Sequence, residues 1–145
     1  MLAMVAVLCV SSSCGDSTPT FPSNVGYAGQ WSGTVLQGGS VSFTVSPEQR
    51  VTSITVSYSL SGCSGSTTFS GLSLDIATPL RPPGSPSVGP FDNPGFGYAS
   101  GTPQGQNFIS LTGAFTSTRT ATGVTIFSDF LGCGSGLATW NATRR

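Results

Sequence analysis

The chain has 145 residues, enough for one domain that buries a hydrophobic core without the help of a metal. Only 7% of the residues are charged, against roughly 25% in an ordinary globular protein, and the formal net charge is zero. The five basic residues are scattered arginines, so the basic patch that nucleic-acid binding requires is missing. The composition therefore predicts no nucleic-acid partner.

The amino-terminal residues read as an export signal. Residues 1–10 form an apolar run that is too short to span a bilayer but suits a secretory signal. Small residues precede Cys14, as in a bacterial lipobox, although Ser11 stands where that motif has an apolar residue. We expect a signal peptide over residues 1–13, lipidation of Cys14 and a Ser/Thr/Pro tether over residues 14–26. The alternative is ordinary signal-peptidase cleavage, which gives a free periplasmic or extracellular protein.

Residues 27–145 alternate between apolar and hydroxylated side chains, which is typical of half-buried β-strands. The first strands are expected over residues 27–35, 40–46 and 50–60. Val51 is out of phase with Ile54, which predicts a bulge near Thr52. A loop over residues 61–66 is followed by a strand over residues 67–76, whose phase shifts at Gly71.

A stretch dense in proline and glycine, residues 78–93, cannot form a central strand, because proline has no amide hydrogen to donate. Further strands are expected over residues 94–100, 107–116 and 122–126. A last strand over residues 137–142 is followed by Arg144 and Arg145, interpreted as a solvated tail. The pattern predicts a single all-β domain of about eight antiparallel strands, a β-sandwich in preference to a closed β-barrel.

Two cysteines, Cys63 and Cys133, remain after the expected processing, both in loops rich in glycine and serine. An even pair in an oxidising compartment predicts a disulfide. It would close a loop of about seventy residues, worth roughly 4 kcal/mol in the chain-entropy model. A metal site is the competing interpretation, but zinc needs more cysteine or histidine ligands than the chain has. We expect no metal and no cofactor.

Catalytic side chains are scarce, because the chain has no histidine and no lysine to act as a base or nucleophile. A glycosidase would need two converging carboxylates. The acids available to the domain are interpreted instead as solvated turn or strand-end residues: Glu48, Asp75, Asp92 and Asp129. The sequence predicts that the protein is not an enzyme and has no catalytic residues.

Aromatic residues are the better candidates for binding. Phe91 and Tyr98 flank the proline-rich stretch and are the candidate ligand contacts. Trp31 and Trp140 lie on alternating strands and are interpreted as core. The Ser/Thr faces of the strands offer an ordered array of hydroxyls to a flat surface, and the alternative is that they keep a weakly charged sheet soluble.

Five short motifs follow one another in order: Gly29-Gln30-Trp31-Ser32-Gly33, Cys63, Gly113-Ala114-Phe115, Cys133-Gly134 and Trp140. This order resembles a group of small exported bacterial β-domains and lipoproteins of unknown function. The resemblance covers most of residues 27–144 and implies a fold, without an active site. The opening Gly-x-Trp-x-Gly is also similar to lipocalin-like barrels, which is the basis of the barrel alternative.

Together these patterns predict a non-enzymatic exported lipoprotein of the cell envelope, held at the outer membrane or cell surface by its lipid anchor. Its domain would be a structural, adhesion or binding module, with a protein or glycan partner that the sequence does not identify. The alternative is a carrier of a small apolar ligand or a carbohydrate, with a cavity lined by inward aromatic residues.

Overall fold

The computed structural model describes residues 26–60, 63–77, 93–102 and 107–145. These ranges form β1 (Gly29–Val35), β2 (Ser40–Val45), β3 (Arg50–Leu60), β4 (Cys63–Asp75), β5 (Gly95–Ser100), β6 (Phe108–Phe115), β7 (Thr120–Ser128) and β8 (Gly136–Arg144), with a 3-10 turn η2 (Phe130–Gly132) between β7 and β8. The expected signal peptide, Cys14, the tether up to residue 25, and Phe91 in the proline-rich stretch lie outside the described residues.

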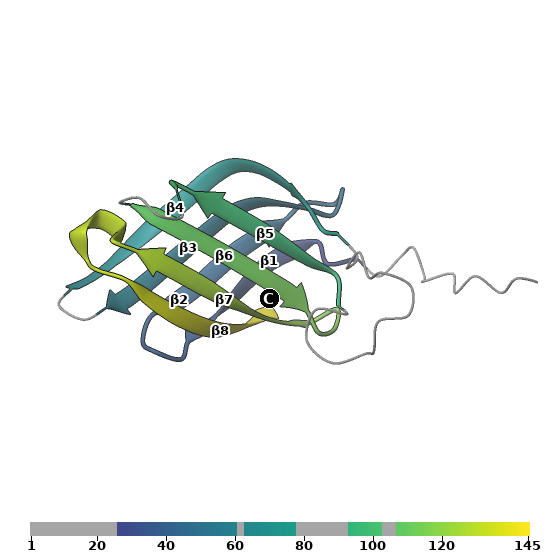
Figure 1. The fold of residues 1–145 in the computed structure, drawn as a ribbon. Coiled ribbons are helices and arrows are strands. Elements are labelled where there is room, and N and C mark those ends of the chain that lie inside the picture. The colour runs from purple at the N-terminus through teal and green to yellow at the C-terminus, as the bar shows by residue number, and fades with distance from the viewer. Residues whose placement is uncertain (1–25, 61–62, 78–92, 103–106) are drawn as a thin grey trace, which may run out of the picture.

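All eight strands pair antiparallel in one continuous sheet of order β4-β3-β2-β1-β8-β7-β6-β5. The outer strands β4 and β5 approach each other through a bridge between Ala77 and Gly95. Figure 1 shows the β5–β8 half crossing in front of the β1–β4 half, so the sheet curls into a nearly closed barrel. The all-β prediction with eight antiparallel strands is confirmed. Because one sheet carries all the strands, the barrel alternative describes the arrangement better than the sandwich.

Aromatic rings from both halves fill the interior. Trp31 of β1 stacks on Phe43 of β2 with ring centroids 5.5 Å apart, and Phe115 of β6 meets Trp31 edge-on at 5.0 Å. Phe43 also contacts Phe96 of β5 at 5.0 Å and Trp140 of β8 at 6.0 Å. Aromatic pairs at such distances add stability beyond the area they bury. Both tryptophans are core residues, as the sequence predicts.

Two glycines make room for the indole of Trp140. The register places Trp140 opposite Gly123, and Gly123 opposite Gly113 on the next strand. A Cβ atom on Gly123 would overlap the indole, and one on Gly113 would lie 2.7 Å from indole Cη2. Glycine is needed at both positions because the ring passes directly over the backbone.

The irregularities that the sequence predicts are present. The register of β3 shifts around Thr52, between Val51 and Ser53, which confirms the bulge. In β4 the alternation of burial shifts at Gly71, whose φ is +69°.

The expected loop over residues 61–66 is shorter in the structure, because β4 already begins at Cys63. Its first residues pair with the end of β3, where Tyr58 lies opposite Gly65. A Cβ on Gly65 would lie 2.7 Å from the Tyr58 hydroxyl oxygen, so the glycine lets the tyrosine ring cross the hairpin. The glycines and serines that suggest a loop are therefore compatible with a strand here.

Replacing Gly123 by alanine is expected to lower the free energy of unfolding by about 1–3 kcal/mol or more, because the new methyl group overlaps the indole of Trp140. Urea denaturation measures the loss. The matched control is Gly97→Ala on β5, where the nearest atom to the new Cβ is Cγ2 of Thr112 at 3.9 Å. The control should change stability by less than about 0.5 kcal/mol. Equal losses in the two variants would contradict the packing argument.

Candidate functional site

A disulfide joins Cys63 at the start of β4 to Cys133 in the loop after η2, with Cα atoms 5.6 Å apart. The bond connects the β1–β4 half of the sheet to the β5–β8 half across 70 residues of sequence. The predicted pairing is confirmed. Because disulfides persist in oxidising compartments and are rare in the cytosol, the bond indicates a location outside the cytoplasm.

The loop that carries Cys133 has a tight backbone. Asp129 and Leu131 adopt left-handed φ values of 44° and 52°. Asn107 binds both sides of this turn. Its backbone N–H donates to the Asp129 carbonyl at 3.0 Å, and its side-chain Oδ1 accepts from the backbone N–H of Leu131 at 2.8 Å. Phe130 is buried against Tyr58 of β3 at 5.8 Å. These contacts place Cys133 beside the β3–β4 hairpin, where Cys63 lies.

Replacing both cysteines by serine, Cys63→Ser with Cys133→Ser, is expected to lower the free energy of unfolding by about 2–5 kcal/mol, because the unfolded chain regains the freedom of a long loop. Denaturation with and without a reducing agent measures this. The reductant should destabilise the native protein and leave the double variant unchanged. Identical behaviour of the native protein in both conditions would contradict a stabilising bond.

The two ends of the barrel differ in charge. The entry end is defined by Gly26, the β2–β3 turn and the last residue of β8, Arg144. The disulfide end is defined by Cys63 and Cys133. Among the described residues, Asp129 is the charged residue at the disulfide end. The other charged residues lie at the entry end: Glu48, Arg50, Asp75, Arg119, Arg144 and Arg145.

Arg144 holds the point where the chain enters the domain. Its Nη1 donates to the carbonyl of Gly26 at 2.7 Å and to that of Ala28 at 3.4 Å. The neighbouring Arg145 donates from Nε to the hydroxyl of Ser32 at 2.8 Å. The interpretation of these arginines as a solvated tail is wrong, because β8 pairs with β1 as far as Arg144 and brings both side chains to the first strand.

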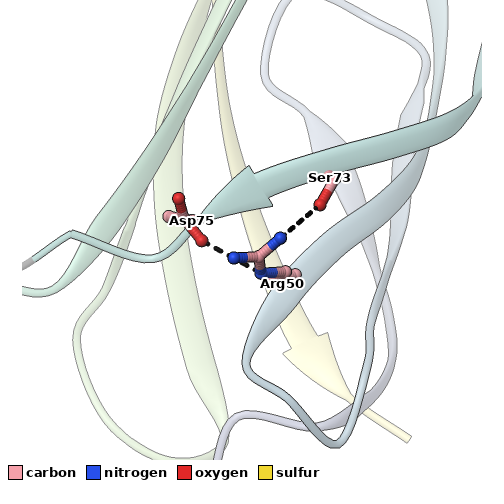
Figure 2. A network of polar contacts seen from close by, with 3 residues as sticks. All are labelled: Arg50, Ser73 and Asp75. Atoms are coloured by element: carbon pink, nitrogen blue, oxygen red, sulfur yellow. Dashed lines mark hydrogen bonds and ion pairs between the residues drawn. The ribbon is translucent and has the colours of Figure 1, made fainter.

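An exposed network lies at the entry end of β3 and β4 (Figure 2). Arg50 Nε lies 3.1 Å from a carboxylate oxygen of Asp75, and Arg50 Nη1 donates to the Ser73 hydroxyl at 2.8 Å. The side chains of the ion pair are 49% and 74% exposed. Pairs this exposed contribute little to stability.

The acids that the sequence offered for a carboxylate pair have separate surroundings. Asp75 pairs with Arg50, Glu48 lies exposed in the β2–β3 turn, and Asp129 lies at the disulfide end. Asp92 is outside the described residues. Within the described ranges, His, Cys, Asp and Glu residues form no group of three that could hold a metal ion.

A hydrogen bond from the Ser46 hydroxyl lowers the pKa of Glu48, with smaller contributions from the Glu48 backbone amide and the Arg50 charge. A carboxyl group whose pKa is lowered by folding stabilises the folded state above its unfolded pKa, and this contribution is lost as the pH falls through its folded pKa. The contribution of Glu48 to folding is therefore present when its carboxyl group is ionised.

The variant Ser46→Ala is expected to raise the pKa of Glu48 toward its ordinary value, because the strongest hydrogen bond to the carboxylate is removed. An NMR titration of the Glu48 carboxyl measures the pKa. The control Ser42→Ala, on the exposed side of β2, should leave it unchanged. An unchanged pKa in Ser46→Ala would contradict the assignment.

The candidate contact residue Tyr98 lies half-buried on β5, and its ring packs on Phe69 of β4 at 4.6 Å. This pair covers the seam between the two outer strands of the sheet. The structure thus gives Tyr98 a packing role at the seam, and its expected companion Phe91 lies outside the described residues.

Aromatic rings of both halves of the sheet meet in the interior of the barrel. A hollow near the disulfide end, lined by Val35, Val56, Tyr58, Phe127 and Ala138 among others, has room for about one water molecule. Thr125 Oγ1 and Trp140 Nε1 are buried and have no hydrogen-bond partner among the described residues. This hollow is far smaller than the pocket of an ordinary small-molecule site.

The outer surface of β2, β3 and β4 is rich in hydroxyl groups. Serine and threonine occupy nine outward positions between the two ends, and hairpin pairing aligns them in rows across the strands. The alternation of residues in the sequence predicts that each strand has hydroxyls on one face. It does not predict the rows, which follow from the pairing register of the strands. The signal available in the sequence is that these three strands are consecutive and joined by short turns.

Comparison of the chain with protein-family models, curated proteins and solved structures finds no match. The geometry of the residues therefore carries the functional argument. In the part of the chain that the structure describes, none of the helical turns is long and apolar enough to cross a membrane.

Proposed function

We propose that the protein is a non-enzymatic, exported lipoprotein of the cell envelope, attached at the outer membrane or cell surface through lipidated Cys14. The observation that carries the export in this proposal is the Cys63–Cys133 disulfide, since such bonds persist in oxidising compartments and are rare in the cytosol. The apolar run over residues 1–10 and the small residues before Cys14 add the export signal and the attachment point.

The direction of the strands supports a domain that projects from its anchor. The chain enters β1 at the entry end, where Gly26 is held by Arg144. The nine residues of β8 span about 30 Å between that end and the disulfide end. A tether that reaches the domain at Gly26 would leave the disulfide end and the outer faces of the sheet free to meet a partner.

The packed interior favours a role for the surface over a role as a carrier. Trp31, Phe43 and Trp140 occupy the centre of the barrel, where a carrier of small apolar or carbohydrate ligands would hold its cargo. The hollow described at the disulfide end has room for about one water molecule, which is too little for such a ligand. We therefore assign the domain a structural or adhesive role through its outer faces.

Mass spectrometry of the mature protein, purified from membranes, tests the anchor. We expect Cys14 to be the first residue and to carry a lipid mass, and Cys14→Ala to abolish that mass and release the protein from the membrane fraction. The matched control is Cys9→Ala within the apolar run, which should leave the modification intact. An unmodified amino terminus beyond Cys14 would overturn the anchor.

A further inference from the structure

Serine and threonine hydroxyls cover the outer side of β2, β3 and β4 in three consecutive rows. Each row takes one residue from each strand, as the register shows. The nine residues, called the hydroxyl face from here on, are Ser40, Ser57 and Ser66; Ser42, Thr55 and Thr68; and Thr44, Ser53 and Ser70. All nine are exposed or half-buried.

Two pairs of neighbouring hydroxyls on the face are hydrogen-bonded to each other. The Oγ1 atoms of Thr55 and Thr68 lie 2.9 Å apart, and the Oγ atoms of Ser40 and Ser57 lie 2.8 Å apart. A hydroxyl can donate one hydrogen bond and accept two, so each pair keeps capacity for an outside partner. The cross-strand bonds orient these four hydroxyls before any partner binds.

Charge is confined to the border of the hydroxyl face. Arg50 and Asp75 pair with each other at the entry end of β3 and β4 (Figure 2). Arg145 reaches Ser32 on β1, one strand beyond the face. An ionic partner would find no opposite charge among the nine residues, whereas a neutral partner rich in hydroxyls would find a donor or acceptor at every position.

We propose that the hydroxyl face binds a neutral polysaccharide of extended conformation. Sugar hydroxyls donate and accept hydrogen bonds as serine and threonine hydroxyls do, so the two surfaces are complementary in chemistry and in lack of charge. The inference deepens the binding role proposed above and rests on it. It does not depend on the lipid on Cys14, so the two proposals can fail separately.

The geometry of the strands favours a polymer over a single sugar. Hydroxyls repeat about every 4.8 Å across the strands and about every 6.8 Å along each strand. One sugar unit would reach few of them, and each bond replaces a bond to water with a small net gain. A chain that lies along the face makes many such contacts at once, and the linked contacts raise its overall affinity.

Depletion from solution by insoluble polysaccharides tests the proposal, with cellulose, chitin, starch granules and a linear β-1,3-glucan as probes. The full-length exported protein should bind at least one of these probes, and the bound fraction should be the same at low and high salt, since no ion pairs form. The variant with Thr55→Val and Thr68→Val keeps the branched side-chain shape but removes two central hydroxyls. Its apparent affinity should fall at least about fivefold.

The matched control is Thr112→Val with Thr143→Val, two exposed threonines on β6 and β8 outside the hydroxyl face. It should bind as the native protein does. Circular dichroism and thermal unfolding establish that both double variants fold, and Ser57→Arg, which places a bulky charge in the face, should also lose binding. Equal binding by the two double variants, or binding that disappears in high salt, would overturn the proposal.

Two further outcomes refute the assignment. Failure to bind any of the four probes would refute polysaccharide binding. It would not affect the proposal of a lipid anchor, which mass spectrometry tests independently. Adsorption to growing ice crystals with no polysaccharide bound would show that the hydroxyl face orders water instead.

Discussion

The contact of Trp140 with two glycines is the constraint on which the barrel depends. Its indole lies over Gly123 and reaches Gly113, on two neighbouring strands. Phe96 fills the space on the far side of Gly113, where a Cβ would lie 2.8 Å from its ring. Phe43 from the opposite half of the sheet contacts both rings. The missing side chains thus let aromatic residues of both halves meet in one layer.

Ion pairs contribute little to this fold, and packing together with one covalent bond takes their place. The ion pair of the described residues, Arg50 with Asp75, is largely exposed. The disulfide closes the end of the barrel that lies away from it. The surface can therefore consist largely of hydroxyls, because stability does not require charges there. The packed aromatic interior therefore allows the protein to have few charged residues.

Several features can be predicted from the sequence because they depend on the local residue pattern or on the number of cysteines. The bulge at Thr52 shows as a break in alternation, and the pairing of Cys63 with Cys133 follows from two cysteines in an exported chain. The single continuous sheet is harder to predict, because it depends on pairing between β1 and β8, at opposite ends of the domain. A period of two residues places side chains on faces but does not decide which strands meet.

The same limit explains the parts of the surface that sequence reasoning missed. Arg144 looks like the end of a tail until β8 is placed beside β1, when its guanidinium reaches the carbonyl of Gly26. The serines and threonines of the hydroxyl face are visible as alternation, whereas their alignment in rows needs the register of two hairpins. Gly65 suggests a loop because the sequence does not show the ring of Tyr58 that crosses it.

The attachment of Gly26 by Arg144 has a mechanical consequence. β1 is bonded along one side to β2 and along the other to β8. Because hydrogen bonds of an antiparallel ladder run perpendicular to the strands, a pull on residue 26 along the axis of β1 loads both ladders in shear. Many bonds then resist together instead of opening one after another. A load that arrives through the amino-terminal segment therefore meets the domain at a strand that is bonded along both sides.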